Sequence, residues 1–247
     1  MCKKPMPADA AFETDAGKAF LNGMIQNIIF DMGGVLIQFD RDYFIRRLKV
    51  AAEDERVLLN EVFRSLEWAR LDRGTITEAD AIEGVCTRLP RRLHAAAADL
   101  ITSWDRPIIP VEGMCELIEE IKGKGYGVYL LSNASLRQHE FWPRIPASGF
   151  FDGTLISADV KLVKPQPEIY TLLCGMFGLK PNECFMIDDT PQNIEGAYEA
   201  NLAGFVFNND VPALRNALKQ AGVNLAQADQ GPACTSLKSR NSREEYM

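Results

Sequence analysis

Short apolar runs alternate with longer stretches of amphipathic spacing along most of the chain. A short run rich in β-branched and aromatic residues predicts a buried strand, whereas apolar residues three or four positions apart predict a helix. Five runs predict strands, at residues 28–30, 128–131, 151–156, 184–187 and 203–207. Helical spacing follows most of them. Strands that alternate with helices are typical of the α/β class, so we expect a doubly wound, Rossmann-like parallel sheet.

One long stretch interrupts this alternation. From Tyr43 to about Arg106 the apolar residues keep helical spacing, and we find no strand pattern among them. Within it, Thr77 with Asp80 three positions later is typical of a helix N-cap with an acidic first turn. The stretch therefore predicts an inserted, all-helical cap domain.

The two ends of the chain differ from the rest. The first segment is small, polar and without the apolar region of a secretory signal, and the last is rich in Gln, Ser, Lys, Arg and Glu. We assign no function to either end. The predicted organisation is a flexible N-terminal extension (1–23), an α/β core (24–41 and 107–223), a helical cap (42–106) and a disordered tail (224–247).

The composition excludes several kinds of partner. The 247 residues carry a formal net charge of −7, which argues against a broad nucleic-acid-binding surface. No apolar run approaches the ~20 residues that a membrane span requires. Six cysteines are scattered without a C-x-x-C pair, which favours reduced thiols in a cytoplasmic protein. We expect a monomer or a dimer with neither nucleic acid nor membrane as a partner.

Polar residues follow three of the predicted strands at the points where the strands end. They are Asp31, the pair Ser132-Asn133 and the pair Asp188-Asp189. The carboxyl ends of parallel strands share one edge of a sheet, where open α/β sheets bind ligands, so we expect these side chains to converge. Lys164, followed by Pro165, lies in a loop between the second and third of these points.

This set of groups suits the transfer of a phosphoryl group. Asp31 is placed to attack phosphorus and to form an aspartyl-phosphate. Mg²⁺ takes oxygen ligands, which carboxylates, a backbone carbonyl, water and the phosphate supply. Ser132 and Asn133 are the candidate phosphate-binding residues, together with Lys164, which offsets negative charge on the nucleophile and the transferring group.

Four stretches in order resemble the motifs of the haloacid dehalogenase-like superfamily of phosphatases. They are Asp31-Met32-Gly33-Gly34-Val35, Leu130-Leu131-Ser132-Asn133, Lys164-Pro165, and Asp188-Asp189 followed by Asn193. The likeness runs from about Ile25 to Phe207, and the helical block lies where the family inserts a cap. It implies an enzyme with Asp31 as nucleophile and ligand of Mg²⁺, a principal metal role for Asp189 and a supporting one for Asp188. The reverse assignment of these two aspartates stays open.

The chain resembles more closely the bacterial sugar-phosphatase subgroup that includes α-D-glucose-1-phosphate phosphatase. Four stretches carry this likeness: Leu131–Asn133, Phe141–Pro143, Asp188–Ala197 and Asp72–Thr77. It implies a small phosphorylated substrate, with a sugar phosphate preferred.

Gly33 departs from the usual pattern of the superfamily. Most of its phosphatases carry a second aspartate at this position, which protonates the leaving alkoxide, and a glycine side chain cannot do so. The backbone carbonyl of Gly33 is still a candidate ligand for Mg²⁺. Loss of general acid catalysis costs ~10²–10⁴-fold in rate. We therefore expect an activated leaving group, a proton donor from the cap, or slow turnover.

Four further residues are predicted to line the substrate pocket. They are Trp68, Arg70 and Arg73 of the cap, and Trp142 of the core. His139 lies in the helix after Ser132 and is within reach of the site as an acid, but a lone histidine there is interpreted as a surface residue.

Two other functions use the same residues. In a metal-independent 2-haloacid dehalogenase, Asp31 would attack carbon, and those enzymes also lack the second acid. In a non-catalytic binding protein, the fold would persist without its proton donor. The adjacent pair Asp188-Asp189 favours a cation, and hence a phosphatase, because two neighbouring carboxylates repel each other without one.

Overall fold

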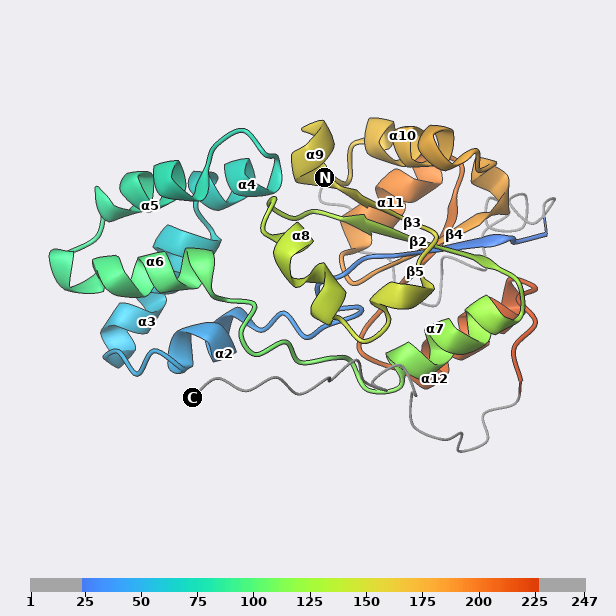
Figure 1. Ribbon diagram of the computed structural model, residues 1–247, viewed down its shortest axis with the longest axis horizontal. Coiled ribbons are helices and arrows are strands. Elements are labelled where there is room, and N and C mark those ends of the chain that lie inside the picture. The colour runs from blue at the N-terminus through green and yellow to red at the C-terminus, as the bar shows by residue number, and fades with distance from the viewer. Residues whose placement is uncertain (1–23, 227–247) are drawn as a thin grey trace, which may run out of the picture.

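The computed structural model describes residues 24–226, and its centre is a parallel sheet of five strands (Figure 1). The strand order is β3-β2-β1-β4-β5. All neighbouring strands are parallel. The predicted α/β fold class is confirmed, and each of the five expected strands is present. Their bounds are β1 Asn27–Phe30, β2 Gly127–Ser132, β3 Gly153–Ile156, β4 Cys184–Asp188 and β5 Ala203–Val206.

The register of the sheet brings the ends of its three central strands level. Phe30 of β1 pairs with Leu130 of β2 on one side and with Ile187 of β4 on the other. The next residue, Asp31, donates its backbone N–H to the Ile187 carbonyl at 2.8 Å. Asp31 therefore leaves the sheet between the last residues of β2 and β4.

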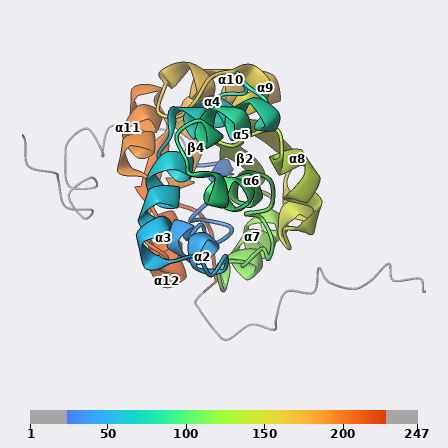
Figure 2. The same ribbon diagram turned by 90° about the vertical axis from the view of Figure 1, so that its left-hand side faces the viewer.

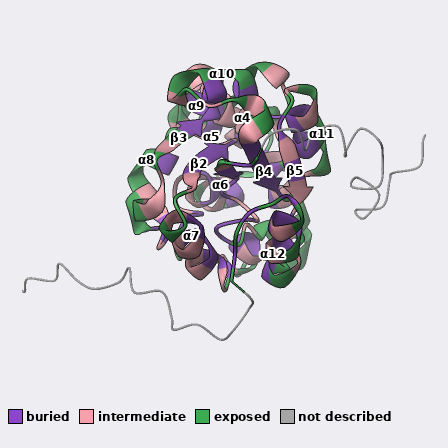
Figure 3. Cartoon of the chain, turned by 90° about the vertical axis from the view of Figure 1, so that its right-hand side faces the viewer, coloured by how far each residue is buried: buried purple, intermediate pink, exposed green. Residues whose placement is uncertain are grey.

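Apolar side chains alternate between the two faces of the sheet, as the period of a strand requires. Ile28 and Phe30 belong to a core cluster on one face, and Ile29 belongs to a second cluster on the other. Helices α7 (Met114–Gly123) and α12 (Val211–Gln220) cover the first face, and α10 (Pro167–Phe177) and α11 (Pro191–Glu199) cover the second. Figure 3 shows the buried strands enclosed between these helices. The sheet is thus doubly wound.

A group of helices follows β1 and lies beyond the carboxyl ends of the strands. Its members are α2 (Arg41–Arg46), α3 (Ala52–Leu58), the π-helical continuation η3 (Leu59–Phe63), α4 (Leu66–Asp72), α5 (Glu78–Cys86), the 3₁₀ turn η4 (Arg91–Leu93) and α6 (His94–Thr102). Figure 2 shows them in front of the sheet. Apolar residues of this cap belong to the same core cluster as the first face of the sheet, so the cap is packed onto the core. The exact domain boundaries stay a prediction.

Short elements connect the remaining strands. They are α8 (Gln138–Phe141), η5 (Trp142–Arg144), η6 (Ser148–Phe150), α9 (Ser157–Val160) and η7 (Pro181–Glu183). The N-cap expected at Thr77 is confirmed, because the Asp80 N–H donates to its hydroxyl and the Thr77 N–H donates to the Asp80 carboxylate. The predicted N-terminal extension lies outside the described residues, as does the predicted tail from residue 227 on.

The expectation of reduced thiols holds only in part. Cys86, Cys174 and Cys184 are free. Cys115 is disulfide-bonded, so the expectation is wrong there. Cys2 and Cys234 lie outside the described residues. Within residues 24–226 there is no helix with the length and apolarity that crossing a bilayer demands.

The cap and the core meet closely at Gly74. This residue has a φ of +70°, and a Cβ added to it would lie 2.2 Å from the backbone oxygen of Ala158 in α9. A side chain here would therefore be strained by its own backbone and would also push α9 away from the turn after α4.

The variant Gly74→Ala tests this contact. Strain at a positive φ and the clash with Ala158 should together lower the free energy of unfolding by about 2 kcal/mol or more. Denaturant titration measures the change. Gly123→Ala is the matched control, because no described atom lies within 4 Å of its added Cβ. This control should be neutral or stabilising by up to about 1 kcal/mol, and equal effects of the two variants would contradict the close contact.

Candidate active site

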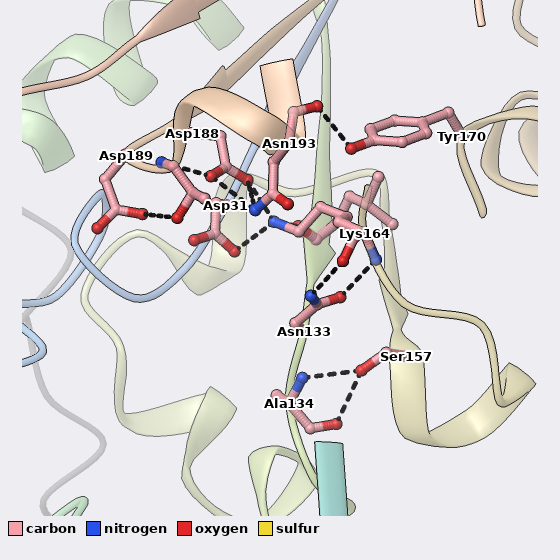
Figure 4. A network of polar contacts seen from close by, with 11 residues as sticks. Asp31, Asn133, Ala134, Ser157, Lys164, Tyr170, Asp188, Asp189 and Asn193 are labelled. Carbon is pink, nitrogen blue, oxygen red and sulfur yellow. Dashed lines mark hydrogen bonds and ion pairs between the residues drawn. The ribbon is translucent and has the colours of Figure 1, made fainter. Parts of the chain in front are cut away.

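Lys164 is the centre of the polar network at the carboxyl end of the sheet (Figure 4). Its ammonium nitrogen donates to Asp31 Oδ1 at 2.8 Å, to Asp188 Oδ2 at 2.5 Å and to the backbone carbonyl of Leu131 at 2.8 Å. An ammonium group has three donors, and all three are used. Lys164 is only 3% exposed. One buried cation thus ties together the ends of β1, β2 and β4.

Asn133 holds the loop that carries this lysine. Its side-chain amide donates to the Lys164 carbonyl at 3.0 Å and accepts from the Lys164 N–H at 2.8 Å. Because this amide is engaged with the backbone, the structure gives Asn133 a positioning role, and a phosphate contact through its side chain stays a prediction. Ser132 ends β2 and is buried, and its contact with phosphate also stays a prediction.

The two adjacent aspartates after β4 have different surroundings. Asp188 is fully buried and accepts hydrogen bonds from Lys164, from the Thr190 N–H and from the Asn193 amide. Asn193 is held in turn by the Tyr170 hydroxyl, which donates to its carbonyl at 2.6 Å. Asp188 is therefore an anchored group within the network.

Asp189 lies closer to solvent and borders the cavity. Its Oδ1 accepts from the Thr190 hydroxyl at 3.2 Å. Its Oδ2 lies 2.2 Å from where a Cβ on Gly34 would stand, and Gly34 has a φ of +77°. Glycine at position 34 is thus required both by the turn after Asp31 and by the approach of Asp189.

The charges of the network do not balance. Oxygens of Asp31, Asp188 and Asp189 lie within 4.8 Å of one another, facing a single ammonium. Burial raises the pKa of Asp31 to about 7, with the charges of the two other aspartates adding to the rise and Lys164 opposing it. Burial and Asp188 also raise the pKa of Asp189. A divalent cation would relieve this repulsion, and carboxylate oxygens are ligands that Mg²⁺ accepts.

A cavity of about 410 Å³ opens above this network. Asp31, Gly33, Lys164 and Asp189 border its floor. Further lining comes from the cap and from α8 of the core. Phe39, Arg41, Trp68, Asp72 and Trp104 belong to the cap or lie next to its helices, and Gln138 and Phe141 belong to α8.

Only one of the four residues predicted to line the substrate pocket is among the lining residues of this cavity. Trp68 lines the cavity, whereas the other three are not among its lining residues. Arg70 is exposed, Arg73 donates to the Gln166 side chain at 3.4 Å, and Trp142 packs edge-on against Phe151. The cavity lining therefore does not support the expectation for these three: Arg70 lies on α4 but faces solvent, Arg73 follows the end of α4, and Trp142 belongs to η5 of the core.

His139 agrees with its interpretation as a surface residue. It is exposed, and its Nε2 lies 3.0 Å from Asp159. Arg41, Asp72 and Gln138 line the cavity but were not predicted to do so. Asp72 does belong to the stretch Asp72–Thr77 that resembles the sugar phosphatases, so that resemblance was the available signal.

The chain belongs to the haloacid dehalogenase-like hydrolase family, whose model matches residues 25–201. It is similar to flavin mononucleotide hydrolase 1 of Arabidopsis thaliana, 27% identical over 116 residues, and that match covers 47% of each protein. It is also 25% identical to D-ribitol-5-phosphate phosphatase of Bacteroides thetaiotaomicron over 192 residues, covering 74% of this chain and 91% of the relative.

Solved structures agree on the fold. The magnesium complex of the haloacid dehalogenase family enzyme bt-2542 from Bacteroides thetaiotaomicron matches with a TM-score of 0.59 and 26% identity, covering 75% of this chain and 94% of that one. An L-2-haloacid dehalogenase from Xanthobacter autotrophicus shares the fold at 17% identity and a TM-score of 0.54, covering 73% and 76%. The family model establishes membership of the family, and the narrower glucose-1-phosphate phosphatase subgroup stays a prediction.

Replacing Lys164 by methionine tests the network. Asp31 and Asp188 would lose their buried cation, which should cost about 3–5 kcal/mol of unfolding free energy. The Lys164 ammonium lowers the pKa of Asp31, so without it the pKa of Asp31 in the folded state should rise further above its value in the unfolded chain. The folded state then binds more protons, so stability falls as the pH rises, and the loss should be larger at about pH 8 than at about pH 5.

Denaturant titration at both pH values, in a metal-free buffer, measures this difference. Lys180→Met is the matched control, because Lys180 is an exposed lysine whose partner is the nearby Glu183. The free energy of unfolding of this control variant should hardly change at either pH. A Lys164→Met protein that is as stable as the parent at the higher pH would contradict the proposed role of the ammonium.

Proposed function

We propose that this chain is a Mg²⁺-dependent phosphoric monoester hydrolase that acts on a small phosphorylated metabolite, with a sugar phosphate preferred. One observation carries the proposal. The Lys164 ammonium joins Asp31 to Asp188 on the floor of the cavity, and Asp189 lies beside them. A nucleophilic carboxylate, a fixed cation and a carboxylate cluster are the groups that an aspartyl-phosphate mechanism requires.

The donor set of the site fits Mg²⁺. Asp188 already accepts hydrogen bonds through both oxygens, from Lys164, Thr190 and Asn193. Asp31 accepts the Lys164 bond through Oδ1. We therefore assign the ion to Asp31, Asp189 and the Gly33 carbonyl, with Asp188 in support. When bound, Mg²⁺ neutralises the phosphate so that an anionic nucleophile can approach it.

In this proposal, the residues of the chain have the following roles in the reaction. Asp31 attacks phosphorus and takes the phosphoryl group, while the leaving oxygen departs on the opposite side, toward the cap. Lys164 holds the Asp31 carboxylate in place and offsets the charge that collects around phosphorus. The cap limits the access of water during attack. Water then hydrolyses the aspartyl-phosphate and regenerates Asp31.

The lining of the cavity supports a polyhydroxylated substrate. Gln138 is 2% exposed, and its Oε1 has no hydrogen-bond partner among the described residues. An unpaired buried acceptor is costly, and a substrate hydroxyl would satisfy it. Arg41 adds a cationic donor on the cap side. A sugar phosphate fits these groups, as it does the likeness to the sugar-phosphatase subgroup. A cytoplasmic location and a monomeric or dimeric state stay predictions.

Asp31→Asn tests the assignment of the nucleophile. Phosphate release from a panel of sugar phosphates should require Mg²⁺, stop with EDTA and return when Mg²⁺ is added back. The variant should lose at least about 10³-fold in kcat, because an amide cannot form the acyl-phosphate. Glu112→Gln, a change of an exposed carboxyl to an amide, is the matched control and should keep full activity.

The same assays separate the two rival functions. Halide release from a 2-haloacid that survives EDTA would identify a metal-independent dehalogenase. Absence of turnover, together with failure of beryllium fluoride and Mg²⁺ to form a stable complex at Asp31, would identify a non-catalytic binding protein.

Thermal unfolding tests the metal site without turnover. Since the pKa of Asp31 is raised to about 7 in the folded chain, the metal-free protein should lose stability as the pH rises toward and through that value. Mg²⁺ binds the ionised carboxylates, so it should raise the Tm by several degrees at about pH 8 and by less at about pH 5. Sodium chloride at equal ionic strength is the control, and an equal rise with this salt would contradict a specific site.

A further inference from the structure

The proposed reaction lacks a proton donor at its usual position. Gly33 has no side chain, and the leaving oxygen of a sugar phosphate needs a proton as its bond to phosphorus breaks. The charged residues that line the cavity are Asp31, Arg41, Asp72, Lys164 and Asp189. The proposed function already uses three of them, which leaves Arg41 and Asp72. An arginine keeps its protons in a protein, so Asp72 is the remaining candidate acid.

Asp72 lines the same cavity as Asp31 and Lys164 and is held there by contacts of its side chain and its backbone. It is the last residue of α4, and its carboxyl has a side-chain hydrogen bond with Trp68 one turn earlier. Its backbone carbonyl accepts a hydrogen bond from the Ser157 hydroxyl. The same hydroxyl oxygen accepts from the Ala134 N–H at 2.9 Å (Figure 4).

This chain of contacts links the cap acid to the site itself. Ala134 directly follows Asn133, whose amide holds the Lys164 loop. Gly74, two residues after Asp72, lies against the backbone of Ala158 next to Ser157. The backbone of Asp72 is thus tied to the core by a hydrogen bond, and its side chain lines the same cavity as Asp31.

We propose that Asp72 is the general acid that protonates the leaving oxygen, and so takes the place of the acid missing at Gly33. This inference rests on the proposed phosphatase function and names a catalytic residue for it.

The surroundings of Asp72 keep a proton on it near neutral pH. Burial raises the pKa of its carboxyl to about 8, the negative charge of Asp31 adds to the rise, and Arg41 opposes it. Lys164 and Asp189 are the other charged groups that border the same cavity. Protonated Asp72 and ionised Asp31 are the two forms that the first step needs.

The proton balance closes over the two steps. In the first, the bond between phosphorus and the ester oxygen breaks, its electron pair stays on that oxygen, and the Asp72 carboxyl supplies the proton that makes a neutral alcohol. In the second, the Asp72 carboxylate takes a proton from the attacking water as the bond between phosphorus and Asp31 breaks. Asp72 is then protonated again for the next cycle.

The test compares two leaving groups in the Mg²⁺-loaded full chain. Nitrophenolate leaves without a proton, whereas a sugar alkoxide does not. For Asp72→Asn, kcat/KM should fall by about 10²-fold or more with the sugar phosphate and by only a few-fold with nitrophenyl phosphate. The ratio kcat/KM covers only the steps up to release of the alcohol. A burst of nitrophenol is also expected, because the second step loses its base.

Controls separate this proposal from its alternatives. Glu83→Gln changes an exposed cap carboxyl and should leave both substrates unaffected. In the parent protein, kcat/KM for the sugar phosphate should decline above about pH 8, where Asp72 loses its proton, and nitrophenyl phosphate should show no such decline.

Two results would overturn the assignment. An equal loss on both substrates would give Asp72 a structural or binding role, and no loss on either would exclude it from the reaction. By contrast, a parent chain that turns over neither substrate would overturn the proposed phosphatase function itself. The two failures are therefore distinguishable.

Discussion

The site depends on one buried ammonium surrounded by carboxylates. Removing such charges from water is unfavourable unless each is paired and hydrogen-bonded. Lys164 meets this condition with one donor each for Asp31, Asp188 and the Leu131 carbonyl. The contacts join three strands to a single loop, so the geometry of the nucleophile is fixed by the sheet. One cation cannot balance three carboxylates, and the excess negative charge favours a second cation beside them.

The cap is positioned against this site by polar contacts as well as by its apolar packing. Ser157 connects the end of α4 with Ala134, which directly follows Asn133 in the segment after β2. At a second point, Arg137 of the core donates from Nε and Nη2 to the Glu78 carboxylate at the start of α5, at 2.6 and 2.9 Å. Hydrogen bonds have directional requirements that apolar packing lacks. The side chains that the cap presents to the cavity are therefore held in a defined place relative to Asp31.

The sequence predicts the sheet and the floor of the site well. A buried strand leaves a local signal of apolar residues, and the polar residue at its end is visible beside it, so the convergence of Asp31, Lys164 and the pair Asp188-Asp189 could be anticipated. The cap residues that line the cavity could not be predicted in this way. Which face of α4 meets the cavity depends on how the whole cap packs onto the core, and the local pattern offered Arg70 and Arg73 as readily as Asp72. Likewise, nothing local distinguishes Asn133 as a phosphate ligand from Asn133 as a support for the Lys164 loop.

The two adjacent glycines of the first motif are under different constraints. Gly34 is dictated by its positive φ and by the approach of Asp189, so no other residue fits there. Gly33 is under no such restriction, since an added Cβ would only touch the ring and Cβ of Phe39, at 3.5 Å and beyond. That ring packs edge-on against Trp104, and the Arg41 guanidinium lies 5.5 Å from its centre. A carboxyl at position 33 would lie beside this ring, and the Arg41 guanidinium on the ring would favour its ionised form over the protonated form that a proton donor needs. In this chain an aromatic ring lies beside Gly33, and the carboxyl proposed to carry the proton reaches the same cavity from the end of α4.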